Sequence, residues 1–220
     1  MSFTYLITRP EHDDTTHYLS NWGEETIKVA ESQGAKVLDL HGERANKEEF
    51  ESKMKKLSPE LVMFNGHGDL DLVTGHKNQV LIKAGVNEEL LKSKIIYALS
   101  CKSAKILGPA SVRAGALSYT GYEDDFIFVY EPNLFTHPLL DKTAGLFLEP
   151  SNIFVESLIK GNSVRESFER SRNIIKKNFN RAVSTLESDP TTARFLWWNL
   201  RNFKSHGDLD VSIKQHLHNT

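Results

Sequence analysis

The sequence is poor in cysteine and in long apolar runs. Cys101 is the only cysteine among 220 residues, which excludes an intramolecular disulfide framework and suits a reducing compartment. No apolar run approaches the ~18 residues of a membrane span, and the first residues lack the basic and apolar segments of a secretory signal. We therefore expect a soluble, cytoplasmic protein whose lone thiol either packs in the core or performs chemistry.

The sequence also lacks a strong net charge and any cofactor motif. A formal charge of −2 gives no global field to hold a polyanion, so we expect no direct nucleic-acid partner and no membrane partner. There is no glycine-rich phosphate loop and no clustered zinc-ligand spacing, so we expect no cofactor and assign no metal. The identity His-Gly-Asp-Leu-Asp at 67–71 and 206–210 is interpreted as coincidence, because the two copies stand in different local contexts.

Apolar and charged residues are present in the proportions of an ordinary globular protein. With 39% hydrophobic and 25% charged residues, we expect one domain over residues 1–220. Apolar runs predict strands at 4–8, 35–40, 61–64, 94–99 and 116–120. Helical spacing predicts helices at 15–33, 47–57, 102–114, 151–160 and 163–186. This alternation indicates right-handed crossovers and an α/β three-layer sandwich around a mainly parallel sheet.

Three stretches do not fit this alternation. Residues 71–84 are typical of a loop or small hairpin. Residues 121–150 contain several breakers, and we interpret them as a long functional or regulatory loop with one short strand. The aromatic stretch Phe195–Phe203 is expected to end as an edge strand ahead of Gly207 and Asp208.

The candidate chemistry stands at the ends of two predicted strands. His67, between two glycines, follows the strand at 61–64, and Cys101 follows the strand at 94–99. Ligands of parallel α/β sheets bind outside the carboxyl ends of the strands, so these two side chains should converge. A buried free cysteine and a Gly-His-Gly turn each have ordinary structural explanations. Their joint position at strand ends favours a catalytic dyad, with His67 as general base and Cys101 as nucleophile.

The neighbours of Cys101 suit a reactive thiol. The thiolate is the attacking species, and both a helix N-terminus and cationic neighbours favour it. Cys101 is expected to open the helix at 102–114, with Lys102 and Lys105 beside it. The backbone amides of Gly68 and Cys101 are candidate donors of an oxyanion hole.

At this point a family resemblance appears. The strand ending in Asn-Gly-His67-Gly68-Asp and the strand ending in Ala-Leu-Ser-Cys101 resemble the caspase-like clan of cysteine peptidases (clan CD), and the CHAT peptidases within it. The segment Gly161–Phe168 is similar to a helix start common in CHAT domains. The aromatic stretch around Trp197 and Trp198 is similar to their final strand region.

The resemblance implies a fold, an activity and a setting. It implies a six-stranded caspase-like sandwich, the dyad His67 and Cys101, and Gly68 as an oxyanion-hole donor. It further implies a thiol endopeptidase that cleaves a protein substrate under the control of a sensor or partner protein, in a prokaryotic antiviral defence or cell-death pathway. The caspase signature Gln-Ala-Cys-Arg-Gly is absent, and His67 precedes Cys101 by 34 residues rather than about 50.

Specificity is therefore expected to differ from that of animal caspases. Relatives of the clan often cleave after Arg or Lys, and Asp124 and Asp125 are candidate substrate-binding carboxylates for such a cation, the alternative being a solvated acidic loop. Asp69 is considered as an orienting group for His67 or as a backbone cap. Two other functions stay open: an inactive caspase-fold scaffold, in which Cys101→Ala leaves function intact, and a thiol amidase of a flavodoxin-like fold.

Overall fold

A six-stranded sheet forms the centre of the molecule in the computed structural model, which describes residues 3–184 and 190–213. In spatial order its strands are β2 (Lys36–His41), β1 (Thr4–Arg9), β3 (Leu61–Asn65), β7 (Ile95–Leu99), β8 (Ser118–Tyr122) and β9 (Phe203–Gly207). The first five are parallel to one another, and β9 pairs antiparallel with β8. From β1 the chain adds β2 on one side and then β3 and β7 on the other. This change of direction places a topological switch point between β1 and β3.

The central strands are buried on both faces. Every residue of β3 is buried, and its side chains alternate between two cores. Leu61 and Met63 belong to one apolar cluster, whereas Val62 and Phe64 belong to the other. A near-continuous apolar run is the expected sequence of a strand covered on both faces, and this explains why β3 was predictable.

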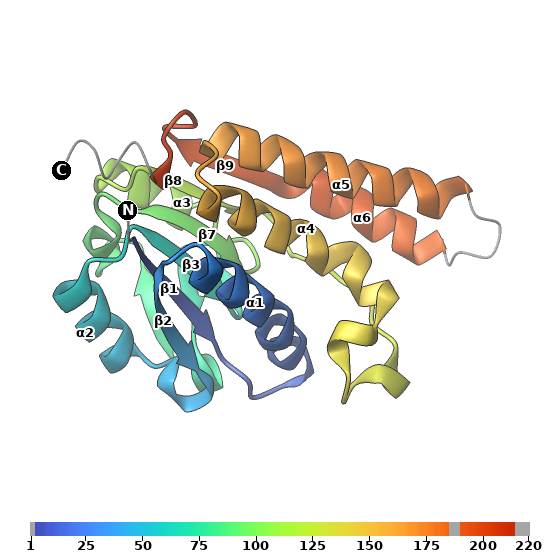
Figure 1. Cartoon of the computed structure of the whole chain (residues 1–220), viewed down its shortest axis with the longest axis horizontal. Coiled ribbons are helices and arrows are strands. Elements are labelled where there is room, and N and C mark those ends of the chain that lie inside the picture. Colours follow the sequence, from blue (N-terminus) through green and yellow to red (C-terminus); the bar gives the residue numbers. More distant parts are fainter. Residues whose placement is uncertain (1–2, 185–189, 214–220) are drawn as a thin grey trace.

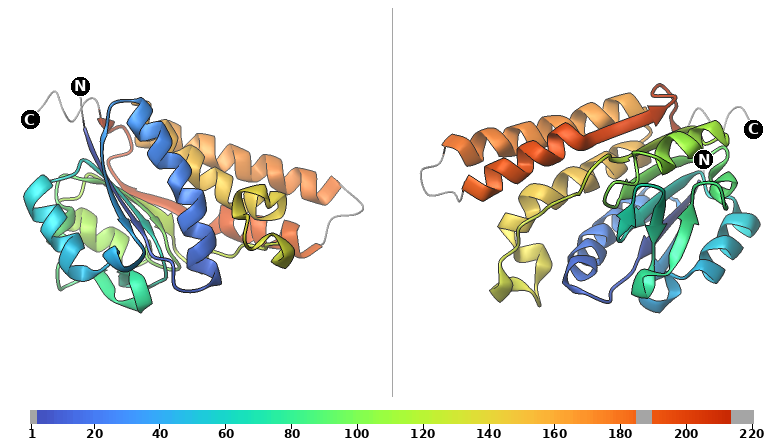
Figure 2. Two further views of the ribbon diagram at one scale, coloured as in Figure 1. Left: turned by 60° about the horizontal axis from the view of Figure 1, so that its bottom comes forward. Right: turned by 180° about the vertical axis from the view of Figure 1, so that it is seen from behind.

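Helices cover both faces of the sheet, as the sequence predicts (Figure 1). One face carries α1 (Asp14–Ser32), α4 (Lys142–Ile159), α5 (Val164–Ser184) and α6 (Pro190–Asn202). The other face carries α2 (Lys47–Leu57) and α3 (Leu107–Arg113). Figure 2 shows α1 and α2 on opposite sides of the sheet. The architecture is therefore a three-layer α/β sandwich.

A small antiparallel sheet follows β3. The predicted loop or hairpin at 71–84 is part of a three-stranded sheet of β4 (Gly68–Asp69), β5 (Leu72–Thr74) and β6 (Val80–Lys83). Val73, Leu81 and Ile82 of this sheet pack in the core on the α2 and α3 side. The small sheet thus fixes the turn around residue 67 to the body of the molecule.

The long loop predicted at 121–150 is shorter in the structure. Helix α4 already begins at Lys142, and Pro150 lies inside it. A proline within a helix leaves the carbonyl four residues earlier without its donor. Here Asn178 Nδ2 of α5 donates to Leu146 O at 2.8 Å. This tertiary contact, which sequence spacing does not reveal, allows the helix to continue through the proline.

The aromatic stretch Phe195–Phe203 was expected to end as an edge strand, and it does: β9 begins at Phe203 and lies at the edge of the sheet, whereas the helix that forms the rest of the stretch was not predicted. This helix is α6, whose Leu196 and Leu200 are buried one turn apart. Helix and strand follow each other without a break (Figure 2). The helix predicted at 163–186 matches α5 over 164–184, and residues 185 and 186 lie outside the described residues.

The second His-Gly-Asp-Leu-Asp copy lies far along the sheet from the first. His206 on β9 pairs with Tyr119 near the amino end of β8, whereas His67 follows the carboxyl end of β3. The two copies therefore do not form one site. None of the helices within 3–184 and 190–213 combines the length and apolarity needed to cross a membrane.

Candidate active site

His67 and Cys101 leave the sheet at equivalent points of adjacent strands. Asn65, the last residue of β3, pairs with Leu99, the last residue of β7. Each candidate side chain stands two residues beyond this pair. The parallel register therefore delivers both residues to the same edge of the sheet, beside the switch point.

The two glycines around His67 are required by close backbone contacts. A Cβ atom on Gly68 would lie 2.8 Å from Cys101 O and 2.9 Å from Ser100 Cβ. Gly66 has a φ of +152°, and a Cβ there would lie 2.5 Å from Thr74 O. The turn carrying His67 therefore packs directly against the chain at Cys101, and this holds the two residues next to each other.

Asp13 holds the imidazole of His67. Its Oδ2 accepts a hydrogen bond from His67 Nε2 at 2.7 Å. Its other oxygen, Oδ1, accepts from the backbone N–H of Thr16 at 2.8 Å, as the N-cap of α1. Because one oxygen is fixed by the helix cap, the second is presented to His67 in a set position.

The environment of Asp13 keeps it ionised. Burial alone would raise its pKa, but the hydrogen bonds from Thr16 and His67 outweigh burial, and the pKa of Asp13 lies below its ordinary value. An ionised carboxylate can only accept, so the proton on the His67 ring resides on Nε2. The lone pair of Nδ1 is then the basic position of the ring.

Cys101 does not open a helix, contrary to the sequence prediction. Residues 101–106 form a turn, and α3 begins only at Leu107. Pro109 explains the late start, because a proline is tolerated in the first turn of a helix but would interrupt a helix that began at residue 102. The turn is anchored to the end of β8, where Ala104 N donates to Tyr122 O at 3.0 Å.

The thiol of Cys101 is held in its neutral form. Burial is the largest cause of its raised pKa, and the carboxylate of Asp125 acts in the same direction. The backbone hydrogen bond of Phe126 and the ammonium of Lys102 lower the pKa but do not outweigh burial, and the Lys102 Nζ lies 3.2 Å from Asp125 Oδ1 and is paired with that carboxylate. The predicted helix N-terminus at Cys101 is therefore wrong, whereas Lys102 lowers the pKa of Cys101 as predicted but is outweighed by burial and Asp125.

A segment that we call the covering segment, residues 123–131, runs over Cys101. The thiol donates to Phe126 O, with the sulfur 3.8 Å from the oxygen. Asn199 of α6 binds both backbone groups of Ile127, through Oδ1 at 3.1 Å and Nδ2 at 2.7 Å. Trp198 Nε1 donates to Asp125 O at 2.8 Å. Helix α6 therefore fixes the segment that limits access to the thiol.

The acidic candidates lie in different places. Asp125, which is paired with Lys102, is adjacent to Cys101. The side-chain Oδ1 of Asp124 accepts a hydrogen bond from the backbone N–H of Asp125, and its backbone carbonyl accepts one from the N–H of Lys102. Asp69 accepts from the backbone of Leu70 through Oδ1. The carboxylate that binds His67 is thus Asp13 and not Asp69.

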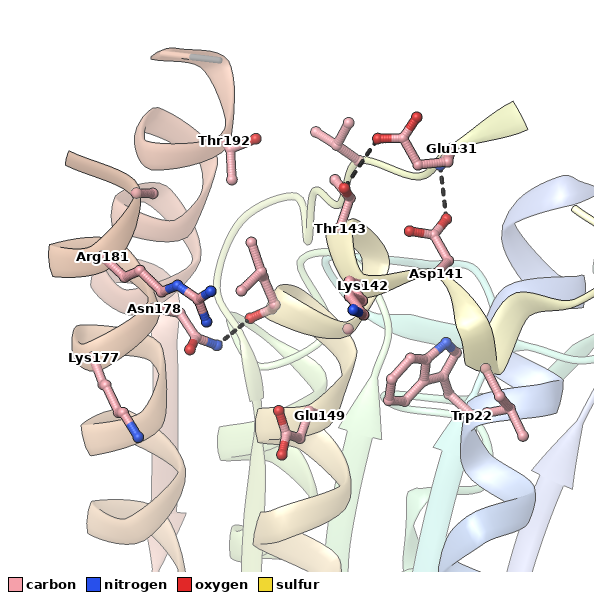
Figure 3. A pocket seen from close by; sticks show the side chains of 15 residues that line it. Trp22, Glu131, Asp141, Lys142, Thr143, Glu149, Lys177, Asn178, Arg181 and Thr192 are labelled. Carbon is pink, nitrogen blue, oxygen red and sulfur yellow. Dashed lines mark hydrogen bonds between the residues drawn. The ribbon is translucent and has the colours of Figure 1, made fainter. Parts of the chain in front are cut away.

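A hollow of about 960 Å³ lies apart from the dyad, between the end of the covering segment and helices α4, α5 and α6 (Figure 3). Trp22, Glu131, Glu149 and Lys177 are among its lining residues, and neither His67 nor Cys101 lines it. Charged residues of both signs and apolar residues line it together. The hollow therefore does not contain the candidate chemistry.

Sequence reasoning missed two residues of the site. Asp13 belongs to a capping box with Thr16 just past the first strand, and that position at a carboxyl strand end is the signal that could have identified it. Asn199 carries no such signal, because its partner is the backbone of an irregular segment more than seventy residues earlier. Both residues act through contacts that only the tertiary structure brings together.

The comparisons with known proteins identify the fold. No known family profile matches the sequence, and no curated protein matches it either. Among solved structures, the crystal structure of the Arg-specific cysteine proteinase gingipain R matches with a TM-score of 0.64 and 10% identity, over 95% of this chain and 46% of that one. The complex of the Porphyromonas gingivalis RgpB pro- and mature domains matches with a TM-score of 0.62 and 9% identity, over 96% and 48%. The chain, which spans about half the length of these structures, therefore has the caspase-like α/β fold of the gingipain cysteine proteinases.

Proposed function

We propose that this chain is a cysteine endopeptidase with Cys101 as nucleophile and His67 as general base. The observation that carries the proposal is the packing of Gly68 against the backbone of Cys101 at the ends of adjacent strands. The caspase-like fold, which cysteine proteinases share, adds independent support. Asp13 is included as a positioning residue for His67.

The residues present account for each proton transfer. His67 Nδ1 takes the proton from Cys101 Sγ, and the thiolate attacks the carbonyl carbon of the peptide bond. The imidazolium then gives its proton to the leaving amine, and an acyl-enzyme remains on Cys101. A water molecule, deprotonated by His67, hydrolyses the thioester and releases the acid and the free thiol. We assign stabilisation of the tetrahedral oxyanion to the amides of Gly68 and Cys101.

The proposal includes cleavage after a basic residue. Asp125 lies beside Cys101 and already binds one cation, the ammonium of Lys102. A substrate Lys or Arg side chain has the same chemistry and would displace Lys102 from that carboxylate. Asp124 adds a second carboxylate next to it.

The neutral, covered thiol supports control from outside. An endopeptidase held in this state needs the covering segment to move and the pKa of Cys101 to fall before it can act. We propose that a regulatory protein partner supplies that change. Membership of the CHAT type, a cytoplasmic location and a role in prokaryotic antiviral defence or cell death rest on the sequence resemblance alone.

A catalytically inactive scaffold is the second candidate. The same observations favour it, namely the raised pKa of Cys101 and its hydrogen bond to Phe126 O. The two candidates differ in what happens when the covering segment is released. An endopeptidase gains a reactive thiol that depends on His67, whereas a scaffold does not.

A fluorogenic peptide panel varied at the first position tests the proposal. Wild type and a variant with the covering segment released, Asn199→Ala, are compared with their Cys101→Ala and His67→Ala derivatives. His206→Ala is a matched control, because His206 has the same following sequence but lies elsewhere on the sheet. We expect cleavage after Lys or Arg that both dyad substitutions abolish and His206→Ala retains. If neither folded wild type nor folded Asn199→Ala cleaves any peptide, the proposed endopeptidase activity is refuted and the scaffold is supported.

A further inference from the structure

A set of contacts surrounds Nε2 of His67, the ring nitrogen that faces Asp13. His12, Asp13 and His67 each offer one ligand atom, and these atoms all lie within 4.8 Å of one another. His67 Nε2 lies 2.7 Å and His12 Nε2 lies 3.5 Å from Asp13 Oδ2. Two imidazoles therefore converge on one carboxylate oxygen.

The His12 ring has no strong hydrogen bond within the described part of the chain. Its side chain is only 10% exposed, and its Nδ1 is buried without a partner. Its Nε2 reaches Asn78 Oδ1 only at 3.4 Å. The neighbouring ring of His76, with its centroid 5.4 Å away, also has a buried and unpartnered Nδ1. Buried polar groups normally have good partners. His12 Nε2, the nitrogen that faces Asp13, has only these long contacts, so this largely buried ring is placed to serve as a ligand.

We propose that His12, Asp13 and His67 form a binding site for a divalent zinc-type metal ion. Two imidazole nitrogens and a carboxylate oxygen are the donors of three-ligand zinc sites, in which water fills the fourth position. With bonds of about 2.0–2.1 Å, the ligand atoms of a tetrahedral site lie roughly 3.3 Å apart. The distances from Asp13 to both rings bracket that value, and the third separation in the set is at most 4.8 Å, so the two rings must turn toward each other to bind the ion.

Metal binding would switch off the base of the dyad, an extension that rests on the proposed function. The metal takes the lone pair of His67 Nε2 and the carboxylate that now accepts from that nitrogen. The neutral ring then carries its proton on Nδ1, which is the atom that must accept the proton of Cys101. The same three residues therefore define an inhibitory site, which holds His67 in the unproductive tautomer without contacting the thiol.

A competing arrangement is chelation by the dyad itself, with His67 and Cys101 as ligands. Substitution distinguishes the two, because Cys101→Ser removes a ligand only from the dyad arrangement and His12→Ala removes one only from the proposed site. A cobalt ion adds a spectroscopic test, since a thiolate ligand gives a charge-transfer absorption that nitrogen and oxygen donors lack. His41→Ala is the matched control, because His41 lies near this edge but binds Glu11.

The experiment measures zinc affinity of the full chain by competition with a chromophoric chelator. We expect wild type, His41→Ala and Cys101→Ser each to bind one zinc ion, and the cobalt form of wild type to show no thiolate band. The zinc affinity of His12→Ala and of His12→Asn should be at least about tenfold weaker. Circular dichroism checks that both His12 variants fold. Unchanged affinity in these variants, or loss of binding in Cys101→Ser, would overturn the site.

The peptidase readout is separate from the binding readout. Zinc should inhibit cleavage at concentrations that match its affinity, and the inhibition constant of His12→Ala should rise by the same factor as its dissociation constant. Zinc binding that depends on His12 in a chain that cleaves no peptide would support the site and refute the proposed endopeptidase. Cleavage that saturating zinc leaves unchanged would overturn the inhibitory role.

Discussion

Asp13 has two structural tasks at the residue scale, and they can be separated by substitution. Asp13→Asn keeps a capable N-cap for α1 but removes the carboxylate that fixes the tautomer of His67. Asp13→Ala removes both. We expect kcat/KM to fall on the order of 10²–10⁴-fold in both variants. The free energy of unfolding should fall by about 1 kcal/mol only in the alanine variant. Peptidase assays and denaturant unfolding measure the two effects, and full activity in Asp13→Asn would contradict the assigned role.

The pKa of Cys101 predicts its reactivity. Burial and Asp125 raise that pKa, so the thiolate fraction near neutral pH is below that of an ordinary thiol, and alkylation by iodoacetamide should be slow and should accelerate as pH rises. Asp125→Asn removes the carboxylate, lowers the pKa and increases the rate at neutral pH several-fold. Asp69→Asn, whose side chain contacts Leu70 N instead, is the control. A rate that Asp125→Asn does not change would show that burial alone sets the reactivity.

The same pKa has a consequence for stability. A thiol whose folded-state pKa is raised holds its proton more tightly in the native chain than in the unfolded chain. Its contribution to the free energy of unfolding is complete below the unfolded pKa and is lost as pH rises through the folded one. Mildly alkaline conditions should therefore both expose the reactivity of Cys101 and weaken the fold around it.

The candidate residues differ in how visible they are in the sequence. His67 and Cys101 could be identified because each follows a strongly apolar strand, and the parallel register then determines their meeting point. Asp13 follows the first strand in the same way, but a capping box alone gives no reason to expect contact with a histidine fifty-four residues later. The raised pKa of Cys101 was not predicted, because its burial and the approach of Asp125 to the thiol are not visible in the sequence.

At the scale of the element, the covering segment and α6 act together. Asn199→Ala removes the two hydrogen bonds to Ile127 and leaves its backbone groups without these partners. We expect a loss of about 1–3 kcal/mol in the free energy of unfolding, together with faster alkylation of Cys101. Asn202→Ala is the matched control on the same helix, because the Asn202 side chain binds Trp198 O within α6. Equal alkylation rates in the two variants would mean that α6 does not restrain the segment.

Element boundaries were predictable where local signals and burial agree. The helix predicted at 47–57 has the bounds of α2, where Asn46 supplies the cap. The predictions failed where a distant side chain decides the outcome. Asn178 allows α4 to pass through Pro150, and the backbone of Tyr122 holds residues 101–106 as a turn. Neither contact follows from spacing within the segment itself.

At the scale of the whole molecule, strand order explains why the chemistry is where it is. β1, β3 and β7 are neighbours, and Asp13, His67 and Cys101 follow their respective carboxyl ends. The three side chains therefore line one edge of the sheet beside the switch point, although they are spread over almost ninety positions of sequence. The parallel sheet could be predicted from apolar runs, but its order required the structure.

The most direct test of the dyad is covalent labelling by a peptidyl acyloxymethyl ketone with Lys or Arg at the first position. Wild type, Asn199→Ala, His206→Ala and the double variant His67→Ala with Asn199→Ala are compared by intact mass and peptide mapping. The account predicts a single label on Cys101, faster in Asn199→Ala than in wild type, unchanged by His206→Ala, and at least about a hundredfold slower when His67 is removed. Labelling of Cys101 at the same rate without His67, or no labelling of folded Asn199→Ala, would contradict it.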